Sequence, residues 1–406
     1  MKLNKIIAIT AILGCMNLML NAQNADIYVA GRGINANDDF IAKWWKNGTG
    51  HNLPLPYNAI RSEATSIFVS GNDVYVAGFE IMYEDDRARL WKNGVAQNLA
   101  NSIGNGGAIA TSVFVSNNDV YVVGDVNGIA KLWKNGIDHD LATTSSYAQD
   151  IFVVDTNVYV AGRIGGTATV WRNGVARTLS NSSSPHSIYV QDTDVYVAGY
   201  KMIYDANPYN DRPTAKLWKN NEEINIFDET LSSQAYDVAV HNDTVYVLAS
   251  YVNGGSSVSV LWKNGVQQIL GGNPYRIFIA GNDIYLAGGR TIWKNGVQHS
   301  VINATEVSIN ALFVVNKATN IEAAVIEQPH LYPNPAKEQF TVVLPEDITN
   351  ATFIMYDMTG REIKNDQLQF AHGKNAIVNV AGMPTGLYVY TILAKDKKYR
   401  GKIIVE

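Results

Sequence analysis

Short runs of Val, Ile, Tyr, Phe and Trp, separated by turn residues, follow one another from Asp26 to Gly296 and predict strands. They recur in a fixed order: an Ile-Phe-Val run, a Val-Tyr-Val-Ala run, a Leu-Trp-Lys run and a run with a polar middle. A repeat of 37 to 50 residues predicts small units that stack and bury one another. The repeated aromatic residues, expected between the units, are Tyr28, Tyr75, Tyr121, Tyr159, Tyr196, Tyr246 and Tyr285, with Trp45, Trp91, Trp133, Trp171, Trp218, Trp262 and Trp293.

The pattern within one unit predicts a four-stranded sheet covered on both faces. The first three runs are apolar at consecutive positions, which is typical of strands that are buried on both sides. The fourth run, for example Val95–Leu99, has a polar middle and suits an exposed outer edge. An Asn-Gly pair such as Asn93-Gly94 joins the third and fourth runs, and it suits a tight hairpin turn with two positive φ angles.

The first unit lacks its Ile-Phe-Val run, and an unmatched run, Leu312-Phe313-Val314, follows the last unit. We expect this run to pair with the segment around Tyr28 and to close a ring. The predicted fold is therefore all-β: a seven-bladed β-propeller of four-stranded antiparallel blades over residues 23–316. It resembles WD40 propellers in strand order over about 26–316 but lacks their Gly-His and Trp-Asp signatures, so the resemblance concerns architecture alone.

After a linker at 317–330, residues 331–406 show a different pattern, with apolar runs at Phe340–Leu344, Ala351–Asp357, Ala376–Val380 and Leu387–Ala394. These runs predict a small β-sandwich. The stretch resembles the type A C-terminal sorting domain of type IX secretion substrates from Bacteroidetes. The resemblance implies the type IX machinery as partner, and then release or attachment at the cell surface; a generic fibronectin-like sandwich is the alternative. The matching motif residues are Tyr332, Pro333, Asn334, Pro335, Gly360, Gly386, Tyr388 and Lys402.

Residues 1–22 have the charged start, apolar centre and small final residue of a secretory signal peptide. A lipoprotein box ending at Cys15 is the competing interpretation, although the apolar stretch continues beyond it. No later segment is long and apolar enough for a membrane helix. We therefore expect a secreted or outer-membrane surface protein.

The loops between the second and third strands and those between blades should share one face of the ring. Insertions there carry Tyr83 and Tyr204, which are candidate ligand contacts. Residues just before the innermost strands should line the mouth of the central channel. These candidates are Glu63, Asp150, His186, Tyr236, Asp237, Tyr275 and Arg276.

Three functions remain open from the sequence. The leading hypothesis is a binding protein with a glycan or protein ligand on the long-loop face. A hydrolase or lyase of extracellular polysaccharides, using Glu63, Asp150 or Asp237, is the alternative, and a purely structural surface module is the third. A net charge of −5 without a basic cluster makes nucleic acid an unexpected partner. No cofactor or metal is predicted. Calcium at Asp85, Asp86, Asp205 and Asp211 is a less favoured alternative, because no EF-hand-like spacing appears.

Overall fold

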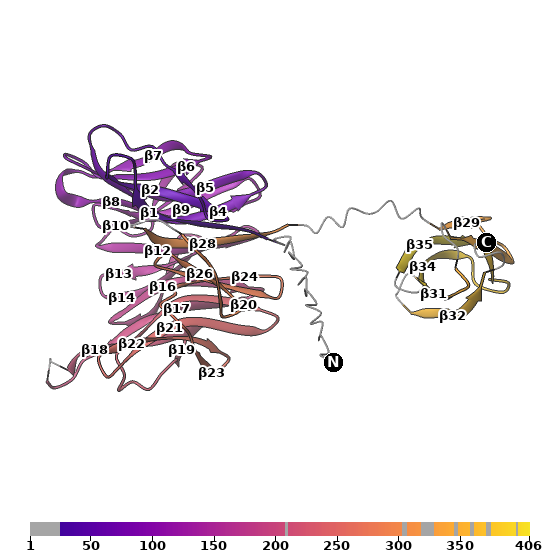
Figure 1. The fold of residues 1–406 in the computed structure, drawn as a ribbon. Helices are drawn as coiled ribbons and strands as arrows, with labels where there is room; N and C mark the ends of the chain where they lie inside the picture. The colour runs from indigo at the N-terminus through magenta and orange to yellow at the C-terminus, as the bar shows by residue number, and fades with distance from the viewer. Residues whose placement is uncertain are drawn as a thin grey trace, which may run out of the picture. The chain divides into compact units, whose positions relative to one another are not determined.

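The structure is a computed structural model that describes residues 25–207, 210–302, 307–317, 329–344, 348–357, 361–370, 375–394 and 397–406. The expected signal peptide at 1–22, with Cys15, and the motif residue Gly360 lie outside the described residues. The chain forms two compact units that divide between Lys317 and Ala318 (Figure 1).

The first unit consists of seven four-stranded antiparallel sheets. Blades 1 to 4 are β28 (Ser308–Asn316), β1 (Ala25–Ile34), β2 (Phe40–Lys46), β3 (Thr49–Asn52); β4 (Ala59–Ser70), β5 (Asp73–Met82), β6 (Arg87–Lys92), β7 (Val95–Asn101); β8 (Ala108–Ser116), β9 (Asp119–Val126), β10 (Ile129–Lys134), β11 (Ile137–Asp140); and β12 (Ser146–Val154), β13 (Asn157–Ile164), β14 (Thr167–Arg172), β15 (Val175–Asn181). Blades 5 to 7 are β16 (Ser183–Gln191), β17 (Asp194–Ile203), β18 (Arg212–Lys219), β19 (Glu222–Asn225); β20 (Ser233–His241), β21 (Thr244–Asn253), β22 (Ser256–Lys263), β23 (Val266–Ile269); and β24 (Arg276–Ala280), β25 (Asp283–Gly288), β26 (Thr291–Lys294), β27 (Val297–Val301).

Blade 1 is built from both ends of the repeat region, as predicted. Strand β28 is the innermost strand of this blade and pairs antiparallel with β1, with Phe313 opposite Tyr28 and Leu312 opposite Val29 (Figure 1). The ring is therefore closed by hydrogen bonds between segments at opposite ends of the repeat region. The seven-bladed architecture expected from the sequence is confirmed.

The repeated motif is a network of side chains that holds the second strand of a blade to the third strand and to the turn after it. In blade 2, Val74 N–H donates to Asn93 Oδ1 (2.9 Å), and Asn93 Nδ2 donates to Asp73 Oδ1 (2.7 Å). The Lys92 ammonium lies 2.7 Å from Asp73 Oδ2 and 5.2 Å from the centre of the Tyr75 ring. Asn93 has a φ of 51°, as the predicted turn requires. The repeated residues therefore serve the fold, and the Tyr and Lys side chains are engaged within the blade.

The core lies between neighbouring blades. Trp91, Trp133, Trp171 and Trp218 are fully buried, and Trp171 donates its indole N–H to Leu141 O of the preceding blade (2.8 Å). Each apolar cluster joins two blades; one contains Tyr75 of blade 2 together with Trp133 of blade 3. Burial of these large rings gives the ring of blades most of its cohesion.

The innermost strands of blades 1 to 6 are longer than the predicted apolar runs, and their pairing with the second strand carries a β-bulge, in blade 2 between Ala64 and Ser66. The bulge brings the main chain close to the second strand. A Cβ on Gly78 would lie 2.1 Å from the carbonyl oxygen of Glu63, so glycine is needed there.

The insertions expected as long loops are mostly extensions of β-hairpins, so the prediction of loops was wrong in detail. In blade 2 the pairing of β5 with β6 continues to Glu80 opposite Arg87, and in blade 5 Lys201 lies opposite Thr214. Pairing satisfies backbone groups that a loop would leave to water. These hairpins still project from the predicted face.

The second unit contains two facing sheets, of order β29-β30-β33 and β32-β31-β34-β35. Phe340, Phe353 and Ile392 are almost fully buried in their shared core, which confirms the predicted small sandwich. The sequence predicted four of these strands and missed β29, β32 and β35; β32 reads Glu-Ile-Lys-Asn-Asp-Gln-Leu-Gln and has little apolar pattern. The strands are β29 (His330–Tyr332), β30 (Gln339–Val343), β31 (Asn350–Tyr356), β32 (Glu362–Gln369), β33 (Asn375–Asn379), β34 (Gly386–Ala394) and β35 (Lys397–Val405).

Candidate functional site

The central channel is lined by layers of side chains from the seven innermost strands. The bulge residues of blades 1 to 6, with Tyr275 at the equivalent position of blade 7, form the layer nearest the long hairpins: Thr65, Thr111, Gln149, His186, Tyr236, Tyr275 and Asn310. The next residue of each strand forms a polar layer: Ser66, Ser112, Asp150, Ser187, Asp237, Arg276 and Ala311. The residues two positions further along each strand form a layer that is aromatic in six blades and that we call the aromatic layer: Phe68, Phe114, Phe152, Tyr189, Ala239, Phe278 and Phe313.

Asp150 and Asp237 of the polar layer are buried and hold neighbouring blades together. Ser112 Oγ donates to Asp150 Oδ1 (2.8 Å), and Ile188 N–H donates to Asp150 Oδ2 (2.9 Å). Asp237 repeats the pattern one pair of blades later, because Ser187 Oγ donates to Oδ1 (2.6 Å) and the next blade's backbone N–H at Ile277 donates to Oδ2 (2.9 Å). Both oxygens of each carboxylate therefore serve the contacts between blades.

Burial is the main influence on these two acids. It raises the pKa of Asp150 to about 6, despite the hydrogen bonds that it accepts, and the charge of Asp237 adds to the increase. Burial also raises the pKa of Asp237, against the opposing charge of Arg276. The two groups were expected at the channel mouth, just before the strands. The structure places them inside the strands, next to the bulge, where they line a small cavity of about 140 Å³ together with His186 and Arg276, and their hydrogen bonds serve the contacts between blades.

Glu63 was expected beside these acids, but it lies in β4 three residues before Ser66, the residue of that strand in the polar layer. Its Oε1 accepts from Asn310 Nδ2 (2.8 Å), and its Oε2 lies 3.5 Å from Arg32 Nη1 and 3.8 Å from Arg61 Nη1. Each of the three carboxylates considered for catalysis is therefore engaged with side chains or backbone of the fold.

Four of the predicted residues do converge, at the hairpin end of the channel. His186, Tyr236, Tyr275 and Arg276 line one cavity of about 360 Å³, which we call the loop-face pocket. Its other lining residues are small or polar: Gln149, Ser250, Ser257, Ser259, Asn273 and Pro274. The serines come from the β21–β22 hairpin, whose Ser-rich sequence carried no signal that distinguished it from a solvent-exposed turn.

His186 has a defined orientation in this pocket. Its Nδ1 lies 2.8 Å from Ala235 O, a contact that needs the proton on Nδ1 and leaves Nε2 as an acceptor in the neutral ring. Burial lowers its pKa below the ordinary value, which favours that neutral form near pH 7. The ring lies parallel to Tyr236 at 6.3 Å and edge-on to Tyr200 at 5.4 Å.

The remaining walls combine phenols with one cation. The Tyr236 hydroxyl lies 2.7 Å from Ser250 Oγ, and the Tyr275 hydroxyl donates to Ile309 O. Arg276 donates from Nε to Asn310 O (2.6 Å) and from Nη1 to Tyr275 O (3.1 Å). Within the described part of the chain, no carboxylate oxygen lies within 4.0 Å of its guanidinium nitrogens. The pocket therefore has aromatic surface, hydroxyl groups and one charge held by neutral carbonyls.

Tyr83 and Tyr204 do not join this pocket. They are 80% and 66% exposed on the hairpins of blades 2 and 5. The neighbouring acids bind their own turns; Asp86 Oδ1 accepts from Met82 N–H (3.3 Å), and Asp211 Oδ1 accepts from Asp205 N–H (2.9 Å). Among the residues that the structure describes, no group of three or more His, Cys, Asp or Glu side chains could hold a metal ion.

The motif residues of the second unit are divided between structural and exposed positions. Asn334 Oδ1 accepts from Ile404 N–H (3.0 Å), and buried Tyr388 donates its hydroxyl to Pro384 O (2.7 Å). Pro333 and Pro335 follow cis peptide bonds. Gly386 opens β34, whereas Lys402 of β35 and Tyr332 of β29 are exposed.

Comparison with known proteins identifies this unit. Residues 330–406 match the family described as the secretion system C-terminal sorting domain. No curated protein sequence matches the chain. No helix of the described residues is long and apolar enough to cross a membrane.

Solved structures resemble the chain at the level of fold. They include YCF48 bound to a D1 peptide, at 11% identity and a TM-score of 0.40 over 70% of this chain and 94% of that one. Drosophila Semaphorin 2a matches at 7% identity and a TM-score of 0.39 over 94% and 96%, and a glycoside hydrolase at 9% and 0.31 over 84% and 94%. The match of residues 330–406 to the sorting-domain family indicates that the chain, with its β-propeller, is exported by the type IX route to a secreted or cell-surface location.

Proposed function

We propose that the propeller is an extracellular binding module that holds a glycan or a protein segment in the loop-face pocket. The observation that supports this proposal is the convergence of His186, Tyr236, Tyr275 and Arg276 on one cavity of about 360 Å³. That volume lies in the range of about 300–1,000 Å³ that is usual for ligand pockets.

The blades supply an internal comparison. The bulge positions of blades 1 to 3 hold Asn310, Thr65 and Thr111, and Thr65 Oγ1 bonds only to carbonyls, of Ala77 (3.1 Å) and Ala110 (2.7 Å). A small polar residue is therefore sufficient for the fold at this position. The larger aromatic side chains in blades 5 to 7 go beyond what the scaffold needs, and we attribute them to ligand contact.

The chemistry of the pocket suits a ligand with both flat apolar faces and hydroxyl or carbonyl groups. Tyr236 and Tyr275 offer ring surface together with a polar end. Arg276 and the nearby serine and asparagine side chains offer donors and acceptors for the ligand's polar groups. The alternative of a polysaccharide hydrolase or lyase finds no support, because Glu63, Asp150 and Asp237 are all engaged in contacts within the fold.

The test uses the mature full-length protein on a glycan array and in pull-downs with purified extracellular proteins, followed by calorimetry of each hit. Tyr236→Ala and Arg276→Gln should weaken binding by at least about tenfold, the loss of one good contact. Tyr83→Ala is the matched control, since it removes an exposed Tyr outside the pocket and should bind as wild type.

A hit whose affinity is unchanged in both pocket variants would contradict the proposed site. Cleavage of a polysaccharide by the wild type, lost in Glu63→Gln, would instead favour the enzyme.

A further inference from the structure

The second notable feature lies on the opposite side of the ring, at the outer groove between blades 4 and 5, where the repeated ion pair is broken. Five blades pair the Lys after the Trp with the Asp before the Val-Tyr run, at 2.7 to 2.9 Å. In blade 4, Asn157 replaces that Asp and Arg172 replaces the Lys. Arg172 Nη2 donates to the neutral Asn157 Oδ1 (3.2 Å), so its charge is not balanced by the usual carboxylate.

A second cation stands in the same groove. Arg177 of β15 lies opposite Val170, a position that holds Gln97 in blade 2 and Gln268 in blade 6. The facing turn of blade 5 is also altered. Asn221, with a φ of 74°, takes the place of the usual glycine and adds a side-chain amide. Three departures from the repeat therefore coincide at one boundary between blades.

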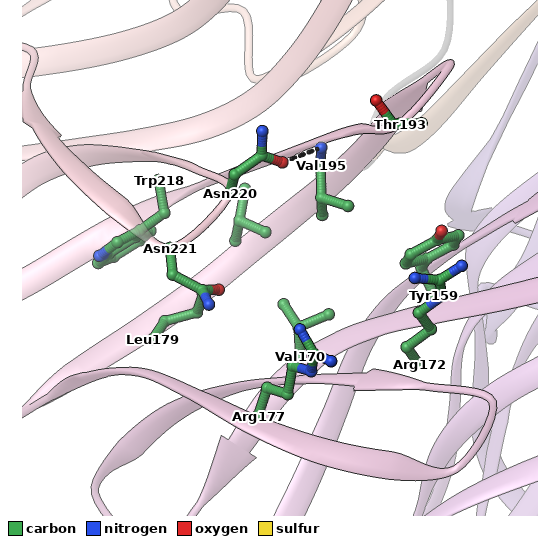
Figure 2. A pocket seen from close by; sticks show the side chains of 11 residues that line it. Tyr159, Val170, Arg172, Arg177, Leu179, Thr193, Val195, Trp218, Asn220 and Asn221 are labelled. Atoms are coloured by element: carbon green, nitrogen blue, oxygen red, sulfur yellow. Dashed lines mark hydrogen bonds between the residues drawn. The ribbon is translucent and has the colours of Figure 1, made fainter.

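These residues surround a cavity of about 260 Å³. Figure 2 shows the guanidinium of Arg177 and the amide of Asn221 reaching toward the same hollow from blades 4 and 5. Arg172 also lines the cavity, with its guanidinium carbon 5.4 Å from the centre of the Tyr159 ring. The floor is apolar and consists of Val170, Leu179, Val195, Val197 and Trp218.

The charge of this cavity is exceptional for an acidic chain of net charge −5. No Asp or Glu lines it, and among the described residues neither guanidinium has a carboxylate oxygen within 4.0 Å. Blade 6 provides a contrast, because Thr244 also replaces the usual Asp there, but Gln268 stands where blade 4 has Arg177. Among the described residues, two arginines without a carboxylate partner therefore line one cavity at the boundary of blades 4 and 5.

We propose that this groove binds the carboxylate or sulfate group of a monosaccharide-sized ligand. Guanidinium groups bind oxyanions through paired, charge-assisted hydrogen bonds, and the Asn221 amide adds a further donor. The apolar floor would accommodate the ligand's ring, and a volume below the usual range for drug-sized ligands suits a single ring. The site is separate from the loop-face pocket and does not depend on the function proposed for it.

The test is calorimetry of glucuronate and of glucose with the mature full-length protein at low ionic strength. Wild type should bind glucuronate at least tenfold more tightly than glucose, and added salt should weaken the binding. Asn157→Asp restores the repeat's carboxylate beside Arg172, and Arg177→Gln restores the residue of blades 2 and 6. Each should weaken glucuronate binding by about tenfold or more without lowering the melting temperature, because each returns the groove to a pattern that other blades already use.

Gln97→Arg is the matched control. It places an arginine in the equivalent groove of blade 2, where Asp73 neutralises Lys92, and should not raise glucuronate affinity. Equal affinity for glucuronate and glucose, or full binding in both Asn157→Asp and Arg177→Gln, would overturn the proposal. The outcome is independent of the array experiment on the loop-face pocket, since neither variant touches that pocket.

Discussion

The two faces of the propeller differ in how far their side chains repeat from blade to blade. On the turn face, the same Asp, Lys and Asn network recurs, with its ion pair present in five blades. On the hairpin face, the bulge positions range from Thr65 to Tyr275 and Asn310. The uniform face shows which side chains the fold uses in most blades, and departures from it mark positions where a further role can be tested. A departure from the repeat does not by itself indicate ligand binding. Asp150 and Asp237 of the polar layer depart from the repeat, and both accept hydrogen bonds from the next blade.

The largest effect should come from the packing that all blades share. Trp171→Ala removes a fully buried ring and its bond to Leu141 O, and should lower the free energy of unfolding by about 3–5 kcal/mol. Urea denaturation followed by tryptophan fluorescence measures it. Trp44→Ala, a half-buried Trp outside the repeated position, should cost distinctly less. Equal losses would mean that the repeated Trp has no special place in the scaffold.

Removing a carboxylate of the polar layer should have the next largest effect. Asp150→Ala leaves the Ile188 N–H and the Ser112 hydroxyl without their acceptor, at a cost of about 2 kcal/mol at pH 7. Chemical denaturation should show this loss, whereas Asp155→Asn, which removes an exposed charge on the next turn and keeps a residue that tolerates its φ of 53°, should stay within about 0.5 kcal/mol of wild type. If both variants were neutral, Asp150 would become available again for a functional role.

The same buried acid should make stability depend on pH. Its folded pKa of about 6 lies above the unfolded value, so the folded state holds the proton more tightly between about pH 4 and 6. The free energy of unfolding should therefore fall as pH rises through this window, by on the order of 2 kcal/mol from this group. Denaturation curves from pH 4 to 7 measure the slope, which Asp150→Ala should flatten. Asp26 should have the opposite effect on stability, and at lower pH. Burial alone would raise its pKa, but hydrogen bonds from Asn47, Lys46 and Lys317 outweigh burial and lower the pKa to about 2. Its stabilising contribution is therefore lost only in stronger acid.

The smallest effect should come from the exposed hairpin aromatics. Tyr83→Ala and Tyr204→Ala remove side chains that are 80% and 66% exposed, and should change the free energy of unfolding by no more than about 0.5 kcal/mol. Thermal denaturation checks this expectation. A loss above about 1 kcal/mol would show that these rings pack on the blades.

Much of the architecture was predictable because its determinants are contiguous. Apolar runs and Asn-Gly turns identified the strands, and the unmatched Leu312–Val314 run indicated the closure that Phe313 and Tyr28 make. Four members of the loop-face pocket were also found from their place near the innermost strands. The sequence did not show that the innermost strands extend through a bulge, which no apolar pattern marks, and so it did not predict that Asp150 and Asp237 lie inside those strands and bond to neighbouring blades. Serines such as Ser257 were missed because they reach the pocket from a neighbouring hairpin.

The sequence by itself determined the blade, its turns, the number of blades and the export module, since each depends on residues close together in the chain. Only the tertiary structure decided which polar side chains are exposed to solvent and which are buried and hydrogen-bonded to a neighbouring blade. Asp150 finds the Ile188 N–H 38 residues away, and Asp237 finds the Ile277 N–H 40 residues away. A carboxylate's role depends on its solvation and its hydrogen-bond donors, and here the decisive donors belong to the next blade.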